Sequence, residues 1–226
     1  MGTHPLMTVG HGLKTVVLIS GNGTNLQAII DAQQAGHLSV GLASVLSDCP
    51  GAFGLERARA AGIPTAVVDY RNCADRSEFD RKLHDELDTV QPELIVLAGF
   101  MRIISDGLTE RYRGRMLNIH PSLLPKYPGL NTYRRVLETD DPYHGSTVHF
   151  VTPQLDAGPP IIQYRVRIRD AETEESLAAR VQAGEYIIYP RTIEWIAERR
   201  LDLRDGTVWL DGQTLEQPVV VNENHA

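Results

Sequence analysis

Short apolar runs alternate with segments of helical periodicity along the first half of the chain. Each run has the length of a strand, and several end at a glycine or a proline. Strands that alternate with helices are typical of a parallel sheet covered on both faces. The pattern predicts strands over 15–20, 40–46, 64–68, 94–99 and 115–119, with helices over 24–35, over 53–61 and after residue 75.

The pattern changes after Gly145. Two strand-like runs, 146–151 and 161–168, follow each other with only a loop between them, which indicates an antiparallel pair or a mixed sheet. A long helical pattern then starts at Thr173, and Pro190 is expected to kink or divide it. The prediction is an α/β fold with a Rossmann-like, mostly parallel sheet flanked by helices and a mixed or antiparallel C-terminal portion.

A single domain is predicted over residues 14–215, because no repeat, low-complexity block or linker interrupts them. Residues 1–13 are interpreted as a flexible leader or an expression remnant, and 216–226 as a loose tail after a hairpin at Asp211-Gly212. No segment approaches the roughly 20 apolar residues that span a bilayer, and the first residues lack the apolar core of a secretory signal. Neither membrane insertion nor secretion is expected.

Composition narrows the class of partner. The 226 residues carry a net charge of −7, which argues against a nucleic-acid partner. Any bound anion must be held by local donors, so a small, specific ligand is expected. The two cysteines, Cys49 and Cys73, stand too far apart for a metal knuckle or a redox pair and suit the reducing cytoplasm. The histidines lack the spacing and cysteine company of a zinc site, so no metal is predicted.

The turn Gly21-Asn22-Gly23-Thr24-Asn25 joins the first predicted strand to a helix. Glycines there allow backbone N–H groups to approach an anion, and the start of a helix adds further donors. The third glycine of a dinucleotide fingerprint and the lysine of a nucleotide-binding loop are both missing, so a single phosphate is favoured. The alternative is an ordinary tight turn capped by Thr24.

Asn118 and His120 stand two residues apart at the end of an apolar run, so both side chains point the same way if that run is a strand. An amide donor and an imidazole are suited to acyl transfer, above all if a buried carboxylate keeps the imidazole protonated. Asp156, in a loop with Gly158, is the candidate carboxylate. The alternatives are a structural histidine and an ordinary turn aspartate.

Four segments resemble the folate-dependent formyltransferases and occur in the same order. The resemblance extends from about Lys14 to about Leu215, nearly the whole chain. It implies formyl transfer from 10-formyltetrahydrofolate, and the first segment together with the total length points to glycinamide ribonucleotide as the acceptor, in de novo purine synthesis. The segments are LISGNGTNL (18–26), LAGFMRI (97–103), NIHPSLLP (118–125) and GSTVHFV (145–151).

The resemblance also implies a role for each matching residue, with phosphate bound by the N-terminal half and folate by the C-terminal half. The catalytic set is Asn118, His120 and Asp156. The ribonucleotide site consists of Gly23, Thr24, Asn25 and Glu185. The folate contacts are Arg76, Met101, Arg102, Ile103, Ile104, Asn118, Thr152 and Asp156.

Direct transfer is the mechanism that the resemblance implies. The substrate amine attacks the formyl carbon, Asn118 and protonated His120 stabilise the oxyanion, and Asp156 keeps His120 charged. One departure from the family pattern is Pro153, which stands where the family often has an acidic residue. We expect Pro153 to stiffen the loop on the folate side.

Two other functions remain open: a 10-formyltetrahydrofolate hydrolase and a catalytically silent ligand-binding domain of the same fold. Hydrolases of this family carry a further domain before the catalytic part, whereas about 14 residues precede the first predicted strand here. The presence of Asn118, His120 and Asp156 argues against a silent domain. The apolar segment around residue 100 has two interpretations, the self-associating surface of a homodimer or part of the core.

Overall fold

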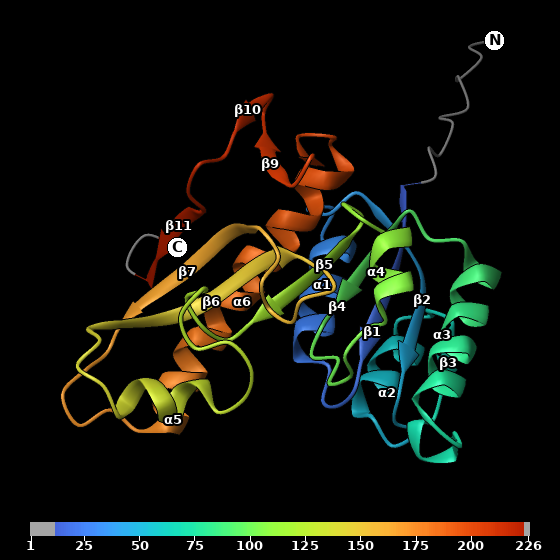
Figure 1. Cartoon of the computed structure of the whole chain (residues 1–226), viewed down its shortest axis with the longest axis horizontal. Coiled ribbons are helices and arrows are strands. Elements are labelled where there is room, and N and C mark those ends of the chain that lie inside the picture. Colours follow the sequence, from blue (N-terminus) through green and yellow to red (C-terminus); the bar gives the residue numbers. More distant parts are fainter. Residues whose placement is uncertain (1–11, 224–226) are drawn as a thin grey trace, which may run out of the picture.

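An eight-stranded sheet runs through the centre of the protein (Figure 1), in the order β11-β7-β6-β5-β4-β1-β2-β3. The computed structural model describes residues 12–223, so most of the expected leader 1–13 lies outside the described residues. The strands are β1 (Leu13–Ile19), β2 (Val40–Ser47), β3 (Thr65–Val67), β4 (Leu94–Leu97), β5 (Met116–His120), β6 (Tyr143–Phe150), β7 (Pro160–Arg167) and β11 (Val219–Asn222).

The direction of the strands changes at β5. Strands β1 to β5 pair in parallel, whereas β5 with β6 and β6 with β7 pair antiparallel. The predicted fold class, a mostly parallel sheet with an antiparallel C-terminal portion, is therefore confirmed. This change of direction matters for the site, because it places the end of β5 beside the middle of β6.

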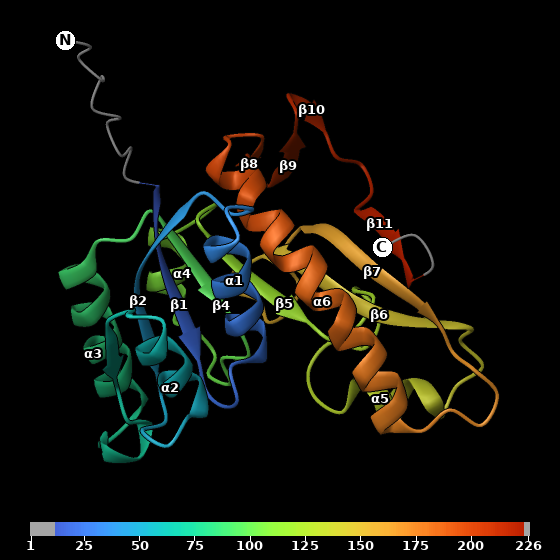
Figure 2. The same ribbon diagram turned by 180° about the vertical axis from the view of Figure 1, so that it is seen from behind.

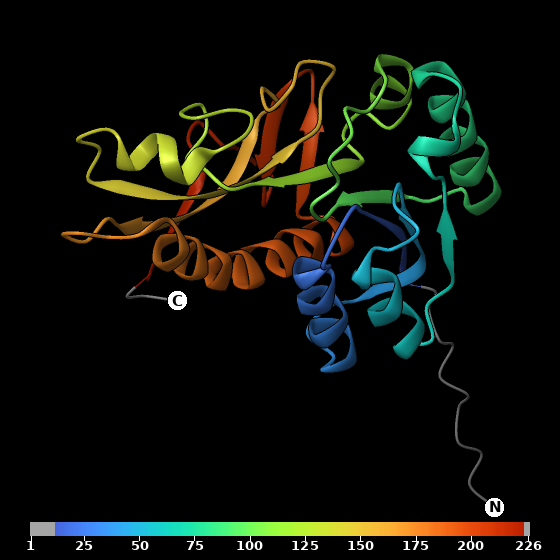
Figure 3. The ribbon, with the colours of Figure 1, turned by 90° about the horizontal axis from the view of Figure 1, so that it is seen from below.

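Helices cover both faces of the sheet (Figures 2 and 3). Successive residues of β1 point to opposite faces: Val17 and Ile19 join the core under α1 and α6, and Val16 and Leu18 join the core under α3. Such a strand is buried on both sides, which explains its continuous apolar run. The helices are α1 (Thr24–Gln34), α2 (Phe53–Ala60), η1 (Tyr70–Asn72), α3 (Arg76–Val90), α4 (Asp106–Arg111), α5 (Thr132–Leu137) and α6 (Glu174–Ala197).

Helix α6 continues through Pro190, so of the two expected effects, a kink or a division, this proline does not divide the helix. Proline in a helix interior costs about 3 kcal/mol. Neighbouring residues of α6 offset this cost, since Ile188, Tyr189 and Ile193 are fully buried against the sheet. The Tyr189 hydroxyl also donates to the Leu97 carbonyl at 2.8 Å. Within residues 12–223, no helix has both the length and the apolar character needed to cross a membrane.

The C-terminal segment corrects a second expectation. The hairpin at Asp211-Gly212 is confirmed, since it joins β9 (Thr207–Leu210) to β10 (Gln213–Thr214), beside β8 (Leu201–Arg204). The expected loose tail, however, contains β11, which pairs in parallel with β7. Arg180 of α6 fixes this end, because its Nε donates to Glu223 at 2.7 Å. An ion pair from a distant helix is not visible in local sequence patterns.

Candidate active site

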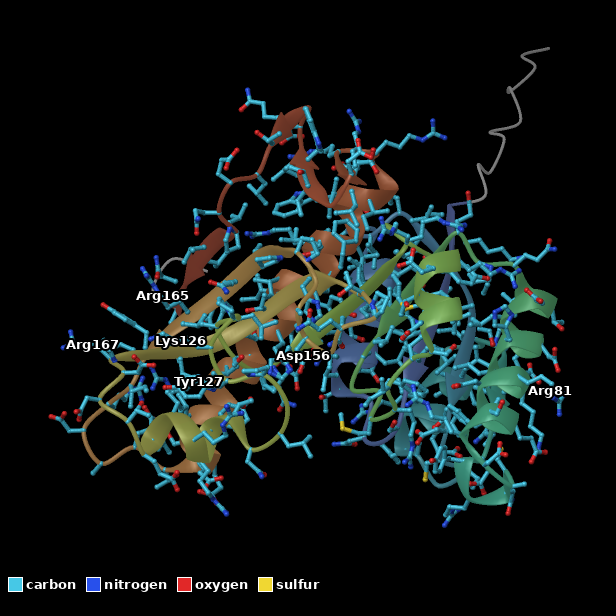
Figure 4. The ribbon with its side chains drawn as sticks, in the orientation of Figure 1. Arg81, Lys126, Tyr127, Asp156, Arg165 and Arg167 are labelled. Atoms are coloured by element: carbon cyan, nitrogen blue, oxygen red, sulfur yellow. The ribbon has the colours of Figure 1, made fainter. Side chains whose placement is uncertain are left out.

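A cavity of about 560 Å³ opens beside the carboxyl ends of β4 and β5. Ligands of open α/β sheets bind at this edge. In the view of Figure 4, Asp156 lies near the middle of the molecule, between the parallel and antiparallel parts of the sheet. The structure brings all three predicted catalytic residues and most of the predicted folate contacts to this cavity. They are Asn118, His120 and Asp156, and Met101, Arg102, Ile103, Ile104 and Thr152.

Strand β5 presents Asn118 and His120 on one face of the sheet, as the two-residue spacing predicts. The antiparallel partner strand sets His149 opposite Asn118 and Thr147 opposite His120. Asn118 Nδ2 lies 3.2 Å from His149 Nε2. From the sequence, His149 flanks a predicted strand near the site and is a candidate supporting residue, but it is not among the predicted catalytic or binding residues. Its alternation with Thr147 along β6 is the signal that places it on the same face as Asn118.

The His120 ring lies between two hydrogen-bond acceptors. Its Nδ1 is 3.4 Å from Asp156 Oδ2, and its Nε2 is 3.0 Å from the main-chain oxygen of Tyr127. Less than a tenth of either the His120 or the Asp156 side chain is exposed, so solvent screens their attraction little. A carbonyl oxygen only accepts, so Nε2 carries the proton of the bond to Tyr127, while Nδ1 faces the Asp156 carboxylate. The Tyr127 carbonyl, which no sequence signal indicated, thus occupies the second nitrogen of His120.

A tight loop holds the Asp156 carboxylate in place. The φ angle of Asp156 is 50°, in the left-handed region that aspartate tolerates. The Gly129 N–H donates to Asp156 Oδ2 at 2.9 Å. At Gly158, an added Cβ would lie 1.7 Å from the Phe150 carbonyl oxygen, so only glycine permits this approach of loop to strand. The carboxylate therefore has little freedom to leave His120.

The predicted phosphate turn leads directly into α1. The residue that caps the helix is Gly23, with φ of 71°, so the expectation that Thr24 caps this turn is wrong. An added Cβ at Gly23 would lie 2.6 Å from the Gly54 Cα, which shows how closely the start of α2 packs against this turn. The first backbone N–H groups of a helix have no intrahelical partner and can bind an anion. The geometry suits a phosphate.

Glu185 of α6 reaches this turn from the other side. Asn25 Nδ2 donates to Glu185 Oε2 at 2.8 Å, and Gln182 Nε2 donates to Thr24 Oγ1 at 3.1 Å. Burial raises the pKa of the Glu185 carboxyl to about 7, and the hydrogen bond from Asn25 acts in the opposite direction. The structure thus places the four predicted ribonucleotide residues in one cluster.

The segment after β4 forms one wall of the cavity. Met101 and Ile103 are 64% and 52% exposed, whereas Phe100 and Ile104 are buried. The segment is therefore partly core and partly cavity wall. Arg76 lies outside the cavity lining but donates to the Ile103 carbonyl at 3.4 Å.

The Arg102 side chain has a partner that the sequence did not indicate. Its Nε donates to Asp48 Oδ2 at 2.6 Å, and its guanidinium lies over the Tyr70 ring, 4.0 Å from the centroid. Asp48 is buried at the end of β2. These contacts fix the wall segment to the neighbouring strand. In the part of the chain that the structure describes, no group of three or more His, Cys, Asp or Glu side chains is arranged to hold a metal ion.

Comparison with known proteins assigns this chain to a family. The family model described as formyl transferase matches residues 13–193, which is most of the chain. The chain therefore belongs to the formyl transferase family.

Particular members of the family are closely similar. A phosphoribosylglycinamide formyltransferase from Escherichia coli (strain K12) is 50% identical over 203 residues, which are 90% of this chain and 96% of that protein. A solved structure of the phosphoribosylglycinamide formyltransferase from Coxiella burnetii has a TM-score of 0.89 and 47% identity, covering 93% of this chain and 99% of that chain. A formyltetrahydrofolate deformylase from Burkholderia mallei is less similar, with 27% identity, a TM-score of 0.80 and coverage of 89% and 71%.

Proposed function

We propose that this protein transfers the formyl group of 10-formyltetrahydrofolate to the amine of glycinamide ribonucleotide, in de novo purine synthesis. The observation that carries the proposal is the contact between the turn before α1 and the cavity wall. Ser20, directly before this turn, donates from its N–H to the Gly99 carbonyl at 3.1 Å, and its Oγ accepts from the Met101 N–H at 2.8 Å. A phosphate on the turn and a folate in the cavity would therefore be neighbours.

The cavity suits the flat, partly apolar ring system of a folate. Exposed Met101 and Ile103 offer apolar surface, and the backbone of the same segment offers polar groups for the ring edge. We assign these two side chains to folate rather than to a homodimer surface. Residues 14–215 would form a single catalytic domain, with small-molecule substrates, no nucleic-acid or membrane partner, and a cytoplasmic location in keeping with two free cysteines.

The chemistry follows from three side chains. The substrate amine attacks the formyl carbon, and the carbonyl oxygen becomes an oxyanion that Asn118 stabilises through an N–H of its amide. His120 donates to the same oxygen from Nε2, after this atom leaves the Tyr127 carbonyl, while Asp156 retains Nδ1. The bond from the formyl carbon to N10 then breaks, and the proton lost by the amine passes to N10, with Asp156 relaying it through water. The mechanism requires no covalent bond between the substrate and Asn118, His120 or Asp156.

Incubation of the purified protein with 10-formyltetrahydrofolate, with and without glycinamide ribonucleotide, tests the proposal. We expect release of tetrahydrofolate, followed by its absorbance, only when the ribonucleotide is present. Equal release without the ribonucleotide would identify a hydrolase, the function of the less similar deformylase. Binding of both ligands without any release would identify a silent binding domain.

A further inference from the structure

His149 is a buried histidine to which the mechanism above assigns no task. It is 2% exposed, lies on β6 and faces Asn118 across the β5–β6 pairing. A buried imidazole needs partners for both nitrogens, and both are present. Nδ1 lies 2.9 Å from the Phe150 carbonyl oxygen, and Nε2 lies 3.2 Å from Asn118 Nδ2.

These two contacts determine where the ring proton sits. A carbonyl oxygen only accepts, so His149 Nδ1 must carry the proton that is shared with Phe150. Burial lowers the pKa of His149, and the nearby His120 ring acts in the same direction. The Phe150 hydrogen bond and the Asp156 carboxylate oppose this shift. The ring is therefore neutral, and its Nε2 offers a lone pair to Asn118.

A lone pair at His149 Nε2 also determines the orientation of the Asn118 amide. It attracts the NH₂ group and repels the amide oxygen, so the amide is held with its NH₂ toward His149. One N–H of that group is bonded to His149, and the second stays available to a substrate oxygen. In the reversed orientation the amide oxygen would take the place of that donor and repel a developing oxyanion.

We propose that His149 is a positioning residue, which fixes the orientation of the Asn118 amide so that it presents an N–H to the formyl oxygen. The inference rests on the proposed function, because it concerns the same oxyanion. Packing supports it: an added Cβ at Gly158 would be 3.3 Å from His149 Nδ1, so the loop that carries Asp156 passes close to the ring.

Two substitutions separate the two contacts of His149. In His149→Asn, the side-chain amide reaches the position of Nδ1 and keeps the donor to Phe150, but offers Asn118 nothing. In His149→Gln, the amide reaches the position of Nε2 and can offer its oxygen to Asn118. We expect kcat of H149N to fall on the order of 10²-fold, near the loss of one oxyanion donor, with KM for both substrates little changed. We expect H149Q to recover most of this loss.

The controls distinguish positioning from a general structural role. H149N should have little further effect on kcat when Asn118 is already alanine, because the two residues act together. Equal losses in H149N and H149Q, or a full additional loss in the Asn118→Ala background, would overturn the inference. Exposed His37→Asn serves as the matched control. A wild-type protein without ribonucleotide-dependent turnover would instead overturn the proposed function.

A measurement on the wild-type protein keeps the inference testable if the variants do not fold. Nitrogen-15 spectra of labelled histidine distinguish the two neutral tautomers and the charged ring. We expect His149 to be neutral and protonated at Nδ1 near pH 7. A proton on Nε2 would refute the proposed orientation of Asn118.

Discussion

Replacement of Glu185 by glutamine separates the charge of this buried side chain from its shape. Glu185 is 6% exposed and accepts a hydrogen bond from Asn25 Nδ2 at 2.8 Å. Burial raises the pKa of its carboxyl from 4.5 to about 7, with the Asn25 hydrogen bond opposing. Glutamine keeps an oxygen for Asn25 but never becomes charged. The negative charge of ionised Glu185 therefore lowers the stability of the folded protein, and E185Q does not carry this charge.

The sign of the effect follows from the raised pKa. The stability that protonated Glu185 contributes is fully present below about pH 4.5 and is lost as the pH rises through about 7. The difference between these two pKa values, at about 1.36 kcal/mol for each pH unit, corresponds to about 3 kcal/mol. We therefore expect E185Q to exceed the wild-type protein in unfolding free energy by up to about 3 kcal/mol at pH 8, and by little at about pH 4.5.

Urea unfolding of both proteins near pH 5 and near pH 8 measures this difference. Glu175→Gln, an exposed residue of the same helix, is the matched control and should follow the wild-type protein. Identical changes between the two pH values in the wild-type protein and in E185Q would refute the reasoning. In the same samples, E185Q should bind glycinamide ribonucleotide more weakly, because stability gained at a functional residue commonly reduces function.

Three further substitutions test the site. Asn118→Ala should reduce kcat by roughly 10²–10³-fold, measured by turnover, and should still fold, measured by thermal unfolding. A smaller loss of kcat would mean that other donors stabilise the oxyanion. Asp156→Asn should retain ribonucleotide binding, measured by calorimetry, and lose most turnover. Near-normal turnover would remove Asp156 from the mechanism. The exposed residue Asp140, replaced by asparagine, is the control. Gly158→Ala places a Cβ 1.7 Å from the Phe150 carbonyl oxygen. This substitution should lower the unfolding free energy by about 1–3 kcal/mol and reduce turnover of the folate substrate. Unchanged stability and turnover would mean that the loop moves away from β6 at little cost.

Much of the fold could be predicted from the sequence because its strands are buried on both faces. An apolar run such as β1 and the longer helices α1 and α3 are local features, so composition and periodicity determine them. The short helices α4 and α5 were missed because six residues give too little periodicity. β11 escaped prediction for another reason, since its pairing with β7 and the Arg180–Glu223 contact join distant segments.

The candidate site shows the same division between local and long-range information. The spacing of Asn118 and His120 is local, and the segments that resemble a family indicate which residues belong to the site. The contacts that decide what each ring donates are of another kind. Any residue at position 127 would offer a main-chain oxygen to His120, so the identity of Tyr127 carries no signal. The pairing of His149 with Asn118 exists only because β6 runs antiparallel to β5 in one register. The proton arrangement at the oxyanion site is thus set by topology, and a shift of one residue in that register would point His149 to the other face of the sheet and leave Asn118 without its partner.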